Sequence, residues 1–320
     1  MNVYERLLKY VVIRTPSNEE SDTTPSSQCQ FDLANVLKKE MEDLGICNVI
    51  LTDSCFLYGK IPATPGYENA PAIGFIAHMD TVSDYCDHDI KPMITEKYDG
   101  EALALGESGV TLSPEMFPHL KNLKGRTLIT SDGTTILGAD DKAGIAEIIT
   151  LAEYLISNPQ HPHPQICILF TPDEEIGRGT DHVDLKKLGA SIGYTIDGGI
   201  LGEFSYENFN AADVEVTIHG ISAHPGYSKG VLKNSMLIAM EFHNLLPVYE
   251  TPECTQNREG FFHLNHIEGC AEKSSMKYLL RDHNYSSYQK RQQLIKNAAD
   301  FLNKKYGKDT IEIKITESYL

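Results

Sequence analysis

Short apolar runs, separated by polar and turn-forming residues, dominate the first two-thirds of the chain. Four of these runs are AIGFIA, ILGA, ICILF and IGYTI. Their length of about five residues is typical of strands that are buried on both faces of a parallel sheet. Apolar residues recur with a helical period at 2–13, 26–45 and 142–157. Strands that alternate with helices predict a mixed or parallel sheet covered by helices, which is an α/β fold.

The pattern changes near residue 211. From there it predicts strand, helix, two strands, helix and strand, at 213–219, 233–246, 260–267, 275–282, 287–306 and 310–316. This order is β-α-β-β-α-β, the ferredoxin-like plan of an α+β domain. We therefore expect two domains, one at 1–210 and one at 211–317.

Metal-binding side chains follow each of the four apolar runs. In chain order they are His78 and Asp80, Asp140, Glu174 and Glu175, and Asp197. The carboxyl ends of neighbouring strands in an open α/β sheet meet at one edge, so these side chains should converge. Carboxylates at close range raise one another's pKa steeply unless cations neutralise them. The pattern therefore predicts a site for two divalent metal ions.

Two of these motifs also have a structural explanation. His78 and Asp80 project to the same side of a strand, so Asp80 can orient His78 while His78 binds a metal. The ordinary explanation is a hydrogen-bonded histidine at the end of a strand. Asp140 and Asp141 stand where a helix begins, and either acid could cap it. Because only one of them can serve as the cap, we interpret Asp140 as a metal ligand and Asp141 as a local structural residue.

The acidic run in TPDEEIG would ordinarily be a solvated loop. Its place directly after ICILF, at the edge where the other ligands end, favours a functional role. Of two neighbouring carboxylates, Glu174 and Glu175, one can bind a metal while the other acts as a general base. His161 and His163 have the spacing of metal ligands, but they lie between prolines, so we predict a surface position for both.

Composition narrows the function. The 320 residues include 28 Lys and Arg against 45 Asp and Glu, a net charge of −17 that disfavours nucleic acid and anionic membranes as partners. The seven cysteines show no paired spacing, which is typical of a reducing compartment. No apolar run approaches the roughly 20 residues of a membrane span, and the first residues indicate an amphipathic helix instead of a signal peptide. We predict a cytoplasmic protein.

The motifs HMD, GADDKAG, PDEEIG with GRGTDH, and DGG with GEFSYENFN closely resemble the tripeptide aminopeptidases of the M20 metallopeptidase family. The resemblance covers the whole chain, including LSPEMFPHL, ISAHPG, NREGFFHL and YLLRDH. It implies a two-zinc enzyme that releases the N-terminal residue from tripeptides. It also implies that 1–210 is the zinc-peptidase catalytic domain and 211–317 a lid domain.

The resemblance implies a role for each candidate residue. The zinc ligands would be His78 and Asp197 on one ion, Glu175 on the other, and Asp140 between them. Asp80 would orient His78, and Glu174 would be the general base. The family pattern also includes a cis peptide bond after the bridging aspartate.

Three residues of the lid resemble substrate-binding positions: His224, Asn234 and Arg281. His224 would help to stabilise the tetrahedral intermediate, and Asn234 and Arg281 would engage the substrate backbone or carboxylate. Their ordinary explanations are a turn histidine before Pro225 and the exposed end of a strand at Arg281.

Members of this family continue beyond the lid with an R-G-G-T-D segment and a final zinc-binding histidine, and the 320-residue sequence contains neither. On this comparison, 318–320 would be the first residues of the segment that leads back from the lid to the catalytic domain, and the catalytic domain would be incomplete. Glu175 would lack its histidine partner, so we expect a weak second zinc site and weak or absent activity on tripeptides. The alternatives are another M20 amidohydrolase, such as a dipeptidase or deacylase, and a non-catalytic metal- or peptide-binding protein. The oligomeric state stays open.

Overall fold

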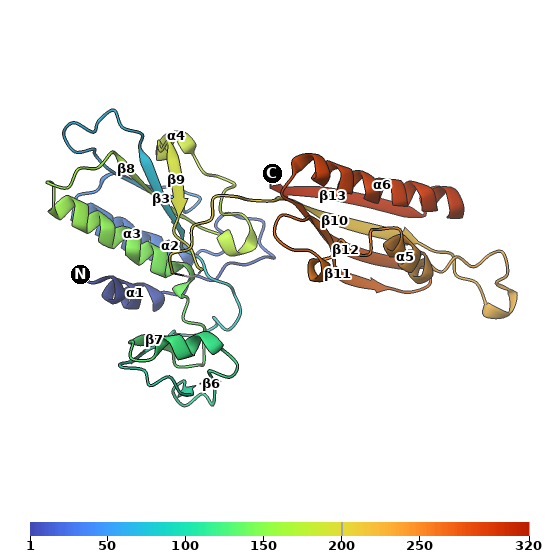
Figure 1. Cartoon of the computed structure of the whole chain (residues 1–320), viewed down its shortest axis with the longest axis horizontal. Coiled ribbons are helices and arrows are strands. Elements are labelled where there is room, and N and C mark those ends of the chain that lie inside the picture. Colours follow the sequence, from blue (N-terminus) through green and yellow to red (C-terminus); the bar gives the residue numbers. More distant parts are fainter. Residues whose placement is uncertain (200, 320) are drawn as a thin grey trace. The chain divides into compact units, whose positions relative to one another are not determined.

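The computed structural model describes residues 1–199 and 201–319, and the chain divides into two compact units, Met1–Leu201 and Gly202–Leu320. Each unit is built around one main sheet with helices beside it (Figure 1). Among the described residues, no helix is long and apolar enough to cross a membrane.

The first unit contains a five-stranded mixed sheet in the order β1-β2-β8-β3-β9. The strands are β1 Cys47–Leu51, β2 Leu57–Ile61, β3 Ile73–His78, β8 Ile166–Thr171 and β9 Ile192–Thr195. Strand β3 is parallel to β8 and β9, whereas β2 is antiparallel to β1 and β8. Every residue of β8 is buried, as the apolar run ICILF predicts for a strand in the middle of a sheet.

Helices cover both faces of this sheet. They are α1 Val3–Val11, α2 Gln30–Leu44, α3 Ala139–Ser157 and the short α4 Leu185–Leu188. Apolar side chains of α2 and α3, such as Leu37 and Ile149, pack with Ile168 of β8 in the larger core. On the other face, Leu188 of α4 packs with Tyr58 and Leu169 in a smaller cluster. The sheet is therefore the middle layer of the unit.

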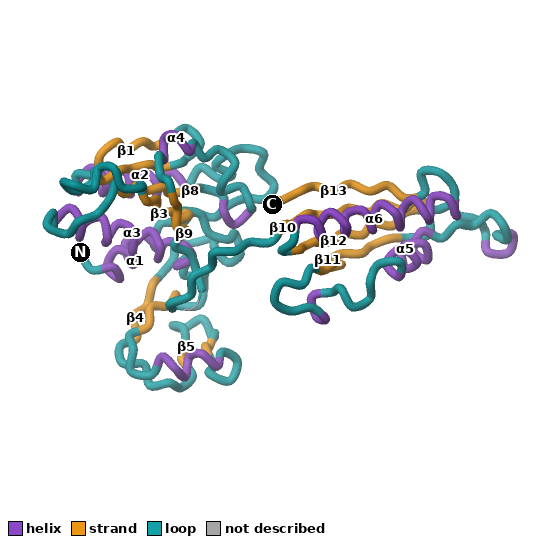
Figure 2. Tube along the Cα trace, turned by 45° about the horizontal axis from the view of Figure 1, so that its top comes forward, coloured by secondary structure: helices purple, strands orange, loops and turns teal. Residues whose placement is uncertain are grey.

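A long excursion joins β3 to α3 and lies apart from the main sheet (Figure 2). It contains two small ribbons and a 3₁₀ helix: β4 Pro92–Thr95 with β7 Leu128–Ser131, β5 Leu103–Ala104 with β6 Thr111–Leu112, and η1 Pro118–Leu123. The run ILGA at 136–139 forms no strand, so the prediction of a strand there is wrong. Gly138 adopts a left-handed conformation (φ 70°), which ends the extended segment and starts α3 at once.

The second unit contains a four-stranded antiparallel sheet in the order β11-β12-β10-β13. Its elements are β10 Asn210–His219, η3 Pro225–Tyr227, α5 Ser235–Asn244, η4 Pro252–Cys254, β11 Phe261–Gly269, β12 Lys273–Asp282, α6 Tyr285–Tyr306 and β13 Ile311–Tyr319. Alternate residues of β10, including Val214, Val216 and Ile218, are buried with apolar side chains of α5 and α6. The helices thus cover one face of the sheet. The predicted fold class, a mixed α/β sheet followed by a ferredoxin-like α+β domain, is confirmed.

Candidate metal centre

The carboxyl ends of three parallel strands lie side by side at one edge of the first unit's sheet. His78, the last residue of β3, pairs in register with Thr171, the last residue of β8. On the other side of β3, Ile76 pairs with Thr195 at the end of β9. The residues that follow β8 and β9 therefore emerge beside His78.

A fourth segment reaches this edge at the beginning of α3. Asp140 and Asp141 depart from helical backbone angles, and the peptide bond between them is cis, as the family resemblance implies. Oδ1 of Asp141 accepts a hydrogen bond from the backbone N–H of Gly144 at 3.1 Å, which caps the helix. Oδ2 of Asp141 accepts the backbone N–H of His78 at 3.2 Å. Asp141 thus ties the start of α3 to the end of β3.

His78 is 2% exposed, and its two ring nitrogens face different partners. Nδ1 lies 3.0 Å from the backbone oxygen of Asp80 and 3.4 Å from its carboxylate. Nε2 lies 3.0 Å from Oδ1 of Asp140, and 3.9 Å from carboxylate oxygens of Glu174 and Asp197. A metal-binding imidazole is usually held in this manner, with one nitrogen on a carbonyl or carboxylate and the other directed at the ion.

Two groups of side chains could each hold a metal ion, and both include His78. One group is His78, Asp140 and Glu175, and the other is His78, Asp141 and Asp197; the donor atoms within each group lie within 4.8 Å of one another. Imidazole nitrogen and carboxylate oxygen are ordinary ligands of zinc, so the residues present fit a divalent cation. The interpretation of Asp141 as only a local structural residue was incomplete, because its carboxylate also lies in a metal-capable group.

Carboxylates crowd this cluster, and their pKa values reflect the crowding. Burial, together with a neighbouring carboxylate, raises the pKa of Asp141 to about 8 against the opposing effect of His78. Burial and nearby acids also raise the pKa values of Glu174 and Glu175. Burial lowers the pKa of His78, but the hydrogen bond to Asp80 and the surrounding carboxylates raise it to about 10. A bound cation would relieve this repulsion.

Asp80 also holds the turn that carries the two glutamates. Its side chain is fully buried, and its two carboxylate oxygens accept the backbone N–H groups of Glu174 at 2.9 Å and Glu175 at 3.1 Å. These residues open the 3₁₀ helix η2, Glu174–Ile176. Asp80 therefore contacts both the candidate ligand His78 and the backbone of the acidic turn, a second contact that the H-x-D spacing did not indicate.

The three candidate lid residues have local partners within the second unit. His224 is exposed, and its ring accepts a backbone N–H from η3 (Pro225–Tyr227) at 3.2 Å. Asn234 caps α5 with its side chain, and the guanidinium carbon of Arg281 lies 4.5 Å from the centroid of the Phe209 ring. The substrate roles of these residues stay predictions.

Neither His161 nor His163 belongs to a metal-capable group in the part of the chain that the structure describes. His161 is exposed and stands against the ring of Tyr154, as expected of a surface residue. His163 is only 8% exposed, so the predicted surface position is wrong for this residue. Its backbone oxygen accepts the backbone N–H of Thr64, and its own backbone N–H donates to the Thr64 hydroxyl.

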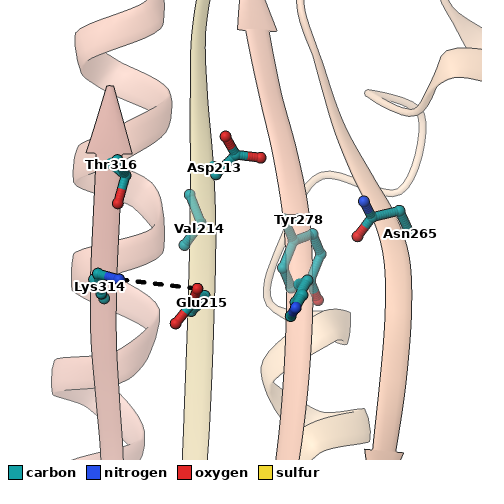
Figure 3. Close-up of a pocket in the computed structure, with 8 residues that line it drawn as sticks. Asp213, Val214, Glu215, Asn265, Tyr278, Lys314 and Thr316 are labelled. Carbon is teal, nitrogen blue, oxygen red and sulfur yellow. Dashed lines mark ion pairs between the residues drawn. The ribbon is translucent and has the colours of Figure 1, made fainter. Parts of the chain in front are cut away.

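A hollow on the open face of the second unit's sheet offers different chemistry (Figure 3). It is lined by Asp213, Val214, Glu215, Asn265, Lys277, Tyr278, Lys314 and Thr316. Lys314 lies 4.0 Å from Glu215 there, and the two acids of the lining are matched by two lysines. Because these charges balance and the lining includes no imidazole or thiol, the His78 cluster is the better metal site.

Comparisons with known proteins agree with the fold. The family description "Peptidase dimerisation domain" of the M20 group matches residues 206–310. The structure is similar to the crystal structure of aminopeptidase PepT from Bacillus cereus, with a TM-score of 0.75 at 24% identity over 100% of this chain and 77% of that chain. A dinuclear metal binding peptidase of the M20 family from Bacillus subtilis gives a TM-score of 0.58 at 14% identity over 99% and 74%. The fold is that of the M20 peptidase structures.

The similarity in sequence is more specific. Peptidase T from Alkaliphilus oremlandii is 48% identical over 320 residues, which cover 99% of this chain and 78% of that protein. The chain belongs to the peptidase T family.

Proposed function

We propose that the chain is a metal-dependent aminopeptidase that releases the N-terminal residue from tripeptides. The observation that carries this proposal is the position of His78 Nε2, which has carboxylates from three other segments at 3.0 to 3.9 Å. This donor set lies at the carboxyl ends of the strands in a chain of the peptidase T family, and it supports metal-assisted hydrolysis of a peptide bond. The motif resemblance supports tripeptides as the substrate class.

We further propose zinc as the metal and two ions as the full complement. His78 and Asp197 would hold the first ion, Glu175 the second, and Asp140 would bridge them. Zinc prefers about four protein or water ligands. In the metal-capable groups of the described residues, His78 is the one imidazole. We therefore expect the ion at His78 and Asp197 to be bound more tightly than the ion at Glu175.

Glu174 is the proposed general base. Its side chain is 51% exposed, so water can reach it, and burial and neighbouring acids raise its pKa, which favours uptake of a proton. Bound divalent ions supply Lewis acidity toward the water and the peptide carbonyl. Glu174 removes a proton from the water as the water oxygen adds to the first peptide carbonyl. It then passes this proton to the peptide nitrogen, which leaves as the amine of the remaining dipeptide.

Positioning and substrate binding complete the proposal. Asp80 holds His78 and the backbone of Glu174. The roles of His224 toward the developing oxyanion, and of Asn234 and Arg281 toward the substrate, rest on the motif resemblance. The free cysteines support a cytoplasmic setting, and the match to a peptidase dimerisation domain supports self-association.

The test compares three substrates with the zinc-loaded chain: a tripeptide with a free amino terminus, a dipeptide and an N-acylated amino acid. The proposal expects the N-terminal residue to be released fastest from the tripeptide, and a chelator to stop the release. Faster cleavage of the dipeptide or the acylated amino acid would favour another M20 amidohydrolase. Peptide binding without any cleavage would indicate a non-catalytic protein.

A further inference from the structure

A buried acid begins the turn that carries the proposed base, and the function proposed above does not use it. Asp173 follows β8, is fully buried, and adopts a left-handed conformation (φ 57°, ψ 28°). It precedes Glu174 and Glu175 directly, yet its carboxylate belongs to neither metal-capable group. Because a carboxylate is costly to bury unless it is hydrogen-bonded, its partners indicate its role.

Three donors converge on Asp173 from a segment about 147 residues earlier in the chain. Oδ2 of Asp173 accepts the backbone N–H of Ser26 at 2.8 Å, and Oδ1 accepts the Ser26 hydroxyl at 2.5 Å. Nε2 of Gln30, the first residue of α2, donates to Oδ1 at 2.7 Å. Ser26 and Gln30 are themselves buried. The carboxylate therefore ties the end of β8 to the beginning of α2.

This tie acts on a turn that is held at other points as well. Asp80 binds the backbone N–H groups at the start of η2. At the other end of the turn, the backbone N–H of Arg178 donates to the backbone oxygen of Asp173 at 2.9 Å. The side chain of Arg178 donates from Nη1 to the backbone oxygen of Ser21 at 2.5 Å. The backbone of the turn at 173–178 is thus fixed from two sides.

The position of Glu174 depends on this backbone. In the part of the chain that the structure describes, the Glu174 carboxylate accepts no hydrogen bond, and it lies 3.9 Å from Nε2 of His78. Its direction is therefore set by the backbone of the turn and by its own side-chain torsions. Any rotation at Asp173 would redirect it.

We propose that Asp173, anchored by Ser26 and Gln30, is a positioning residue that aims Glu174 and Glu175 at the metal centre. The inference rests on the proposed function, in which Glu174 is the base and Glu175 a ligand. Residues that orient ligands and bases without touching the ion typically change metal affinity or activity about 10- to 100-fold when they are replaced.

The principal variant is Asp173→Asn. It keeps the size of the side chain, and asparagine tolerates left-handed backbone as well as aspartate does, so backbone strain is not its effect. It removes the charge and replaces one of the two acceptor oxygens by an amide N–H₂. Because the backbone N–H of Ser26 can only donate, it needs the remaining oxygen, and the N–H₂ then faces the Ser26 hydroxyl and Nε2 of Gln30, which both donate to Asp173 in the wild type. We expect kcat to fall about 10- to 100-fold and Co²⁺ affinity of the zinc-free protein to fall in the same range, with KM within about twofold.

The matched control is Asp309→Asn. Asp309 is also a left-handed aspartate (φ 63°), but it is exposed, so we expect wild-type kcat and Co²⁺ binding. A rescue variant adds Gln30→Glu to Asp173→Asn, because the new carboxylate accepts from the new amide. We expect kcat and Co²⁺ affinity of the double variant to be at least about tenfold higher than those of Asp173→Asn alone. Ser26→Ala, which removes one of the three bonds, should give a smaller loss than Asp173→Asn.

The two hypotheses fail in different ways. If the wild-type chain binds Co²⁺ but cleaves no tripeptide, the proposed function fails, and the Co²⁺ spectrum and affinity of the variants still test the positioning role. The positioning role is overturned if Asp173→Asn leaves Co²⁺ binding unchanged. It is also overturned if the loss only follows the fraction of unfolded protein, or if the rescue variant restores thermal stability without restoring Co²⁺ binding.

Discussion

Replacing Gly144 with alanine should damage the metal centre, although alanine is the better helix former. Gly144 lies near the beginning of α3, and a Cβ atom there would stand 2.0 Å from the backbone oxygen of Ile196 and 2.5 Å from Oδ1 of Asp141. To regain even the 3.4 Å at which ordinary contact begins, the helix and the end of β9 must separate by about 1.4 Å.

Neither side of this contact can move freely. The backbone N–H of Ile196 donates to Ile76 at 2.8 Å, and Asp141 caps the helix through the N–H of Gly144. Separation would carry Asp197, the next residue after Ile196, away from Asp141. Overpacking of this kind costs about 1–3 kcal/mol, which outweighs the gain of about 1 kcal/mol expected from glycine to alanine in a helix. A misplacement near 1 Å in a catalytic site can cost about 100-fold in rate.

The assay compares thermal unfolding, zinc titration and tripeptide cleavage for Gly144→Ala and Gly193→Ala. Gly193 lies in β9, where an added Cβ would meet only Cδ1 of Ile76 at 3.3 Å, the end of a flexible side chain. We expect Gly144→Ala to lower Tm by roughly 2–6 °C, to weaken zinc binding and to slow tripeptide cleavage about 100-fold, while Gly193→Ala stays close to wild type. Unchanged Tm and zinc affinity in Gly144→Ala would refute the packing argument.

Two further predictions concern single glutamates. Burial raises the pKa of Glu40, but hydrogen bonds from Lys9, Arg6 and Tyr10 outweigh it, so the pKa is lower in the folded state than in the unfolded state. The ionised Glu40 therefore stabilises the fold above its unfolded pKa of about 4.3, and this stabilisation is lost as the pH falls through the pKa of the folded state. Glu40→Gln should therefore lower the free energy of unfolding by about 2 kcal/mol at pH 7. Measured by urea unfolding, the variant's free energy of unfolding should fall less steeply than that of wild type between about pH 5 and 3, and an equally steep fall would contradict this assignment. Glu174→Gln should lower kcat about 10²- to 10⁴-fold with zinc binding retained, and activity within tenfold of wild type would argue against a general base at this position.

The parts of the fold that were predicted correctly depend on local patterns. Alternation at Val214, Val216 and Ile218 marks a strand with one buried face, and the continuous run ICILF marks one buried on both. The run ILGA led to the wrong prediction of a strand because it is apolar and short. The left-handed conformation of Gly138, after which α3 begins, cannot be detected in the hydrophobic pattern.

The candidate site was predicted less completely than the fold. The strand-end rule explains why Asp197 lies near His78, because β3 and β9 are neighbouring parallel strands that share an edge. Asp140 also lies near His78, but it reaches this edge from the beginning of α3 and not from the end of a strand, so the rule was right about its place for the wrong reason. The second contact of Asp141 and the tie of Asp173 to Ser26 could not be predicted in this way. They join segments far apart in sequence, and a hydrogen bond between distant segments leaves no periodicity to detect.

The most direct test of the metal centre is anomalous diffraction at the zinc absorption edge from crystals of the zinc-loaded chain. The account predicts a zinc peak about 2.0–2.2 Å from Nε2 of His78 and from a carboxylate oxygen of Asp197. Zinc peaks elsewhere on the chain, with none at His78, would contradict it.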